Sequence, residues 1–124
     1  MTRHLLDGTL SEVAFDNGVE LLIGDALVRL EGPCAFTVTD RAILEFEPER
    51  AARVAAQLVS LLGVETVVSL VDGDRLAIEG AQEEFRLVTL DGGGLESWSI
   101  VRMDDGWRLV DNGSGEVAEW SPKS

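Results

Sequence analysis

The sequence contains few of the side chains from which catalytic and metal centres are most often built. Among its 124 residues there is one cysteine and one histidine. A zinc site needs several cysteine or histidine ligands, and a nucleophile activated by histidine would have to use His4, which we expect to lie in a frayed N-terminal segment. The single Cys34 excludes an internal disulfide bond, and its apolar neighbours predict a buried, unreactive thiol.

Long apolar runs and basic residues are also scarce. No segment approaches the roughly 18 apolar residues of a membrane-spanning helix, and the N-terminus lacks the apolar stretch of a signal peptide. We therefore expect a cytoplasmic protein that does not bind membranes. Ten basic residues against 23 acidic ones give a net charge of −13. That charge disfavours nucleic acid and would attract a basic protein partner, although it is equally typical of a protein that is simply acidic.

The acidic and glycine-rich segments match no ligand-binding motif. Residues 72–74 and 104–106 lack the ligand spacing and closing glutamate of a calcium-binding EF-hand loop, so we interpret both as hairpin turns. Residues 91–94 begin with an acid and lead into a strand, whereas a phosphate-binding loop ends in Gly-Lys-Ser/Thr and leads into a helix. We therefore expect no bound metal or cofactor.

Short strands and frequent turns dominate the rest of the sequence. Because parallel strands need crossovers of about a dozen residues or more, the short connections predict antiparallel pairing. We expect a single α+β domain over residues 1–124, a mostly antiparallel sheet in which two β-meanders flank one central amphipathic α-helix. The expected strands are residues 10–15, 19–23, 26–31, 35–38, 65–71, 75–79, 83–90, 95–103, 107–110 and 116–120.

The helix is expected over residues 48–62. Pro48 suits the first helical position, where its missing N–H costs nothing. Gly63 favours the left-handed conformation that ends many helices. Apolar side chains between these points recur at three- and four-residue spacing and form one stripe. The stripe consists of Ala51, Val54, Ala55, Leu58, Leu61 and Leu62.

All three tryptophans lie in the last third of the chain, where acidic residues also concentrate. We expect Trp98 in the core, and both core and surface positions stay open for Trp107 and Trp120. Tryptophan is enriched at the energetic centres of protein interfaces, and surface acids steer basic partners. We therefore predict a partner-binding surface made of Asp104, Asp105, Trp107, Asp111, Glu116, Glu119 and Trp120.

Several short segments together resemble a known family. They are Gly32-Pro33 with Phe36, Glu47-Pro48-Glu49, Leu61-Leu62-Gly63, Glu96-Ser97-Trp98 and residues 116–120, and their order resembles a family of short uncharacterised actinobacterial proteins. That family brings no catalytic residues to this chain. In size and charge the chain is also similar to immunity proteins of bacterial toxin systems, which are cytosolic and often block a basic nuclease.

The leading interpretation is therefore a non-catalytic acidic interaction protein, of which an immunity-type inhibitor of a basic toxin is the most concrete form. The alternative is a small ligand-binding domain or enzyme with a carboxylate-based site, which would need two acids in one cleft with different pKa values. Exposed strand edges would also allow a homodimer.

Overall fold

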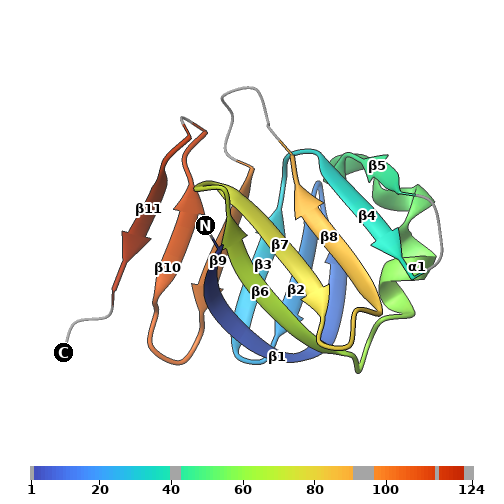
Figure 1. The fold of residues 1–124 in the computed structure, drawn as a ribbon, viewed down its shortest axis with the longest axis horizontal. Helices are drawn as coiled ribbons and strands as arrows, with labels where there is room; N and C mark the ends of the chain where they lie inside the picture. The colour runs from blue at the N-terminus through green and yellow to red at the C-terminus, as the bar shows by residue number, and fades with distance from the viewer. Residues whose placement is uncertain (1, 40–42, 91–96, 114, 122–124) are drawn as a thin grey trace.

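The computed structural model describes residues 2–39, 43–90, 97–113 and 115–121, and in them the chain forms one open antiparallel sheet. Its strand order is β11-β10-β9-β3-β2-β1-β6-β7-β8-β4-β5, so β11 and β5 are the edges (Figure 1). The elements are β1 (Thr2–Phe15), β2 (Val19–Ile23), β3 (Ala26–Leu30), β4 (Cys34–Val38), β5 (Leu44–Phe46), the 3₁₀ helix η1 (Pro48–Arg53), α1 (Ala55–Val59), β6 (Glu65–Val71), β7 (Arg75–Gly80), β8 (Phe85–Thr89), β9 (Trp98–Arg102), β10 (Arg108–Asp111) and β11 (Val117–Trp120).

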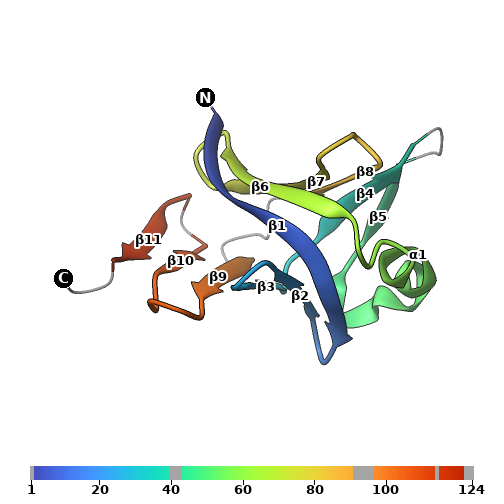
Figure 2. The same ribbon diagram turned by 90° about the horizontal axis from the view of Figure 1, so that it is seen from below.

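The long strand β1 folds this sheet into two layers. Residues 2–9 of β1 pair with β6, and residues 10–15 pair with β2 on the other side of the strand. The register shifts between Leu10 and Glu12, a type of irregularity that bends a strand. One layer therefore contains β6, β7, β8, β4 and β5, and the other contains β2, β3, β9, β10 and β11 (Figure 2).

A second connection joins the layers where β3 continues into β4 and β8 leads towards β9. The two passages are hydrogen-bonded to each other, because Gly32 N donates to Ser97 O at 3.0 Å and Leu90 N donates to Pro33 O at 2.8 Å. The layers are thus tied on both sides of the core, which fixes the distance between them.

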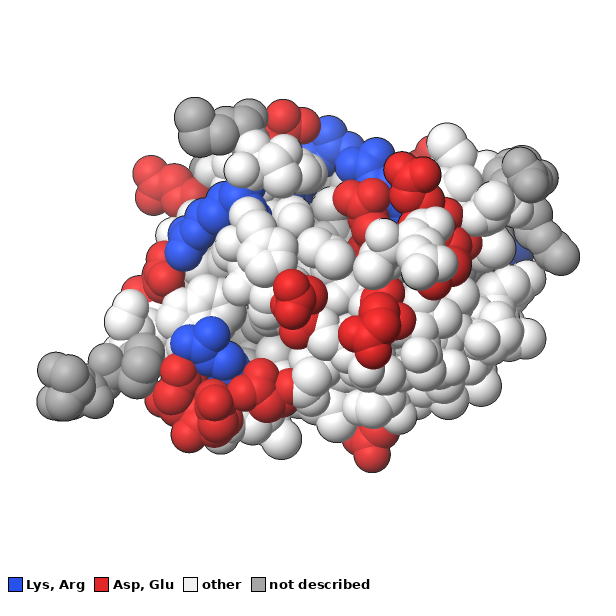
Figure 3. Space-filling model, turned by 60° about the horizontal axis from the view of Figure 1, so that its bottom comes forward, with Lys and Arg blue, Asp and Glu red and all other residues white. Residues whose placement is uncertain are grey.

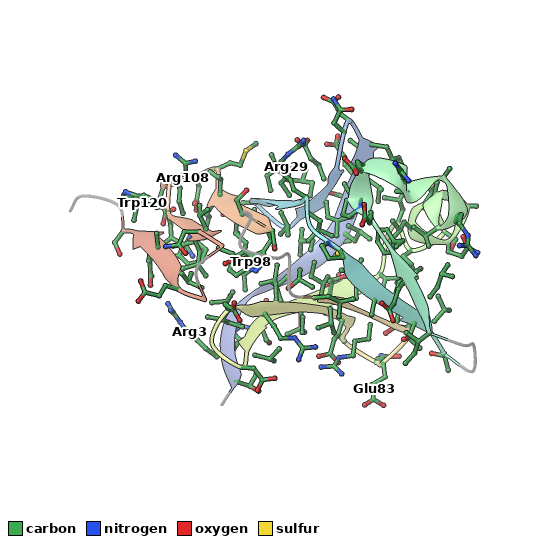
Figure 4. All side chains as sticks on the ribbon, turned by 90° about the horizontal axis from the view of Figure 1, so that it is seen from above. Arg3, Arg29, Glu83, Trp98, Arg108 and Trp120 are labelled. Atoms are coloured by element: carbon green, nitrogen blue, oxygen red, sulfur yellow. The ribbon has the colours of Figure 1, made fainter. Side chains whose placement is uncertain are left out.

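Alternating side chains fill the space between the layers. In β2 and β3 every second residue is buried, as the period of a strand with one covered face requires. Trp98 is 1% exposed, and its Nε1 donates to Asp74 O at 2.9 Å in the β6–β7 turn of the opposite layer (Figure 4). The prediction that Trp98 belongs to the core is confirmed.

Two glycines allow the bend of β1 to lie close to the β2–β3 turn. A Cβ atom on Gly8 would lie 2.8 Å from Gly24 Cα, nearer than real Cβ atoms approach another atom. Gly24 itself has φ +60°, in the left-handed region that glycine adopts without strain. The close packing at this corner therefore depends on the missing side chains.

The prediction of one continuous helix over residues 48–62 is wrong. Arg50 has φ −129° and ψ 48°, outside the helical region, and Val54 separates η1 from the five-residue α1. The apolar spacing still acts in part, since Ala51, Val54, Leu58 and Leu61 are buried. Of the other two residues of the predicted stripe, Ala55 is partly buried and Leu62 is 43% exposed. Short helices have little stability of their own, so packing against the end of the two layers decides the backbone path here.

Three further expectations change. The N-terminus is not frayed, because residues 2–9 form half of β1 and His4 pairs with Ser69. The sheet contains three runs of sequential antiparallel strands rather than two meanders, namely β1-β2-β3, β6-β7-β8 and β9-β10-β11. The sequence also did not predict the short strand β5. The turns at 72–74 and 104–106 are confirmed as hairpins, whereas the turn at 91–94 lies outside the described residues.

Candidate functional site

The tip of the β9–β10 hairpin gathers acidic side chains around one arginine. Arg102 Nη2 lies 2.7 Å from Asp105 Oδ2, and Arg102 Nε lies 3.6 Å from Asp104 Oδ1. Asp25, in the β2–β3 turn of the adjacent hairpin, lies beside this tip, because its backbone carbonyl accepts a hydrogen bond from Met103 N at 2.8 Å. Figure 3 shows acidic side chains around a basic one at this end of the molecule.

The pKa values of the two hairpin aspartates shift in opposite directions. The hydrogen bond from Arg102, followed by that from the Trp107 N–H, lowers the pKa of Asp105. The pKa of Asp104 is raised, first by partial desolvation and then by its hydrogen bond with Asp25 and the nearby charges of Asp25 and Asp105. One arginine therefore does not compensate this cluster, and an added cation would relieve the repulsion.

Trp107 and Glu119 lie on the inner side of the second layer and bind each other, although Glu119 remains exposed. Trp107 is 7% exposed, and its Nε1 donates to Glu119 Oε2 at 2.9 Å. The same carboxylate pairs with Arg3 from the start of β1, with 3.2 Å between Arg3 Nη2 and Glu119 Oε2. The hydrogen bond from Trp107 and then that from Arg3 lower the pKa of Glu119. These contacts hold the edge strand β11 against the opposite layer.

Trp120 lies on the other face of β11. It is 53% exposed and stands opposite Arg108, whose guanidinium carbon lies 5.7 Å from the centre of the Trp120 ring. Figure 4 shows Arg108 and Trp120 on the outside of the second layer, with Trp98 between the layers. Met103, at the end of β9, is 64% exposed.

The seven predicted site residues are thus divided by the fold. Asp104, Asp105, Glu116 and Trp120 are exposed, whereas Trp107 and Asp111 are buried. Asp111 accepts a hydrogen bond from Gly113 N at 3.1 Å, as in an Asx turn, and Glu119 is engaged by Arg3 and Trp107. We call the accessible residues Asp25, Met103, Asp104, Asp105 and Trp120 the hairpin surface.

Sequence reasoning missed two members of this region. Asp25 lies about eighty positions before Asp104 in the chain, and only the pairing of β3 with β9 brings the two turns together. Arg3 was placed in a frayed terminus, so its contact with Glu119 was not foreseen. Residues 2–9 give little strand signal, because their two large apolar side chains, Leu5 and Leu6, are adjacent and do not alternate with polar ones.

Other chemistry is limited in the described residues. Burial raises the pKa of the Cys34 thiol to about 12, so the thiol is protonated at neutral pH, as expected from its apolar surroundings. No group of three or more His, Cys, Asp or Glu residues within the described part of the chain is arranged to hold a metal ion. None of the described helices is long and apolar enough to span a membrane.

A shallow pocket of about 380 Å³ lies beside η1, far from the hairpin surface in the strand order. It is lined by Pro33, Glu45, Phe46, Glu47, Arg50 and Arg53. Among the described residues, Arg50 and Arg53 form no ion pair, unlike five of the other six described arginines. This pocket is the second place where the chain could hold a ligand.

Comparison of the chain with protein-family models, curated proteins and solved structures finds no match. The site must therefore be interpreted from its own residues.

Proposed function

We propose that the protein is a non-catalytic acidic interaction protein that binds a basic protein partner through the hairpin surface. The observation that carries the proposal is the combination of exposed Trp120 and Met103 with three carboxylates, those of Asp25, Asp104 and Asp105, around the single Arg102. Interfaces concentrate binding energy in large apolar anchors, while charges at the rim steer the partner and set the association rate. The net charge of −13 extends that steering over the whole molecule.

An immunity-type inhibitor is the most concrete form of this proposal. Such a protein works by covering the active site of a toxin, and a nuclease that binds phosphates presents a basic site. A small acidic domain whose two layers are connected twice is suited to this task, because a folded surface loses less ordering entropy on binding than a disordered segment would. A cytoplasmic location belongs to the same proposal.

The electrostatic part can be tested by association kinetics with a basic protein captured from the native lysate. Replacing Asp25 and Asp104 by asparagine removes two crowded carboxylates without adding bulk. We expect the association rate at low salt to fall several-fold and to depend less on salt. Glu83→Gln is the matched control, since Glu83 is an exposed carboxylate on the opposite layer (Figure 4). Equal rates for both variants would contradict the placement of the binding surface.

The pocket beside η1 supports the alternative of a small ligand-binding domain. Two arginines without a carboxylate partner among the described residues would suit a ligand that carries a carboxylate or phosphate group. A thermal-shift screen with small carboxylates and phosphate esters tests this function. A stabilisation that Arg53→Gln abolishes would favour the alternative, and no stabilisation by any compound would count against it.

A further inference from the structure

The outer face of the second layer carries a row of side chains that crosses five strands. The strand registers place Leu22 opposite Leu27, Leu27 opposite Val101, Val101 opposite Arg108, and Arg108 opposite Trp120. Residues directly opposite each other in antiparallel strands lie on one face and close together. We call these five residues the outer row.

The outer row points away from the core. Its neighbours along the strands, Val28 and Ile100, are 0% exposed and face the opposite layer, whereas Leu22, Leu27 and Val101 are only partly buried. Strand alternation therefore puts large apolar side chains on the face where polar ones are expected. Among the described residues, no strand or helix lies over this face in Figures 2 and 4.

The outer face of the first layer is different and provides an internal comparison. Its corresponding row runs from Ser69 through Ala77 and Val88 to Ala35, where Ala77 is 0% and Val88 8% exposed. An ion pair between Arg86 and Glu79, 3.6 Å apart, lies beside it. The leucines and the half-exposed tryptophan of the outer row thus have no counterpart in that row of the first layer, and apolar side chains gathered on a surface commonly mark an interaction site.

Charges surround the outer row, and most of them are negative. Arg29 lies next to the row and is already held by Glu20 at 2.6 Å and Glu31 at 2.8 Å, which leaves an excess negative charge there. At the end of the row, Glu12 stands opposite Leu22. The acidic side chains around Asp104, at the tip of the β9–β10 hairpin, lie along a third side of the outer row. An apolar strip with an acidic rim complements an apolar strip with a basic rim.

We propose that the whole outer row, and not only the C-terminal hairpin, is the docking surface for a basic protein that presents apolar side chains ringed by lysine or arginine. This inference rests on the proposed function and extends it to β2 and β3. A second copy of this chain is a poorer occupant, because face-to-face pairing would bring two acidic rims together between molecules that each carry −13. Arg108 over the Trp120 ring keeps that side chain oriented, which lowers the entropy lost on binding.

The test uses neutral substitutions, so that charge and apolar contact are separated. One variant, Leu22→Ser with Leu27→Ser, removes apolar area from the part of the row that lies outside the hairpin surface. The matched control is Ile43→Ser with Val59→Ser, because Ile43 is 68% and Val59 46% exposed and both lie outside the row. Circular dichroism and thermal unfolding establish that each variant is folded. A single Leu27→Ser variant serves if the double variant is unstable.

Wild type, variant and control are used to capture proteins from the native lysate, and the dissociation constant of the captured basic protein is then measured by calorimetry. We expect the row variant to weaken binding several-fold and the control to bind like wild type, since two apolar contacts with the partner are lost. Equal binding by the row variant would overturn this inference and leave the proposed function intact. Capture of no basic protein by the wild type would overturn both.

Light scattering on the purified chain tests whether a second copy of the chain covers the outer row. We expect the mass of one 13.4 kDa chain. A mass of twice that value, reduced to one chain by Trp120→Ala, would overturn the inference by showing that a second copy covers the row.

Discussion

Replacing Glu119 by alanine should destabilise the protein by weakening the attachment of the edge strand β11 to the opposite layer. The Glu119 carboxylate accepts the Trp107 Nε1 hydrogen bond at 2.9 Å and pairs with Arg3 from the other layer. In the alanine variant both partners lose their acceptor. Trp107 is nearly buried, so its N–H would be left with poor access to water.

The size of the effect follows from the two contacts. A hydrogen bond to a charged group contributes about 1.5–3 kcal/mol, whereas an exposed ion pair such as that with Arg3 contributes roughly 0–1 kcal/mol. We therefore expect Glu119→Ala to lower the free energy of unfolding by about 2–3 kcal/mol. Glu119→Gln keeps an oxygen acceptor for Trp107 and should lose only about 1 kcal/mol. Arg3→Met should lose still less.

Urea unfolding followed by far-ultraviolet circular dichroism measures these differences. The pH dependence gives a second readout, because the pKa of Glu119 is lowered in the folded state. A lowered pKa means that the ionised carboxylate favours folding above the unfolded-state pKa of about 4.3, and that this contribution disappears as the pH falls below it. The gap between wild type and Glu119→Gln should therefore narrow on acidification. An alanine variant as stable as wild type, or an Arg3 variant equally damaged, would refute this reasoning.

Three further predictions concern other parts of the molecule. Gly8→Ala should lower the free energy of unfolding by about 1–3 kcal/mol in urea titrations, because its Cβ would meet the backbone of Gly24; no loss would refute the close approach. Cys34 should resist a thiol-specific reagent at pH 8 until urea unfolds the chain, since burial raises its pKa to about 12; fast labelling of the native protein would contradict this. Asp104→Asn should not destabilise the protein at pH 7, because a raised pKa means that the ionised carboxyl opposes folding at neutral pH. Asp105→Asn should destabilise it, because the pKa of Asp105 is lowered and its ionised form favours folding. Thermal unfolding that ranks the two variants in the reverse order would contradict this prediction.

Much of the local structure was predictable because it depends on neighbouring residues. Period-two alternation identified β2 and β3, and the Asp-Gly turns identified the hairpins that follow β6 and β9. Trp98 was expected in the core and lies there. The prediction of one continuous helix was wrong because it used only local information. The apolar spacing over residues 48–62 is present, but spacing alone does not show whether packing will permit a regular backbone.

The candidate site was less predictable because its parts come from distant segments. Arg3 and Glu119 are separated by 116 positions and meet only because the two layers face each other. Trp107 directly precedes β10 and Trp120 lies in the neighbouring strand β11, yet one is 7% and the other 53% exposed. Which face of β10 and β11 meets the core depends on their register, and a shift of one residue would exchange the two faces.

From its sequence alone the chain is determined to be acidic, poor in catalytic side chains and built of short antiparallel strands, because composition and short-range periodicity carry that information. Only the tertiary structure decided that β1 is shared by two layers, that Glu119 serves the fold, and that Leu22, Leu27, Val101 and Trp120 align on one outer face. The physical reason is that strand order and register are set by contacts between distant residues, whose combined burial outweighs the preference of any one segment.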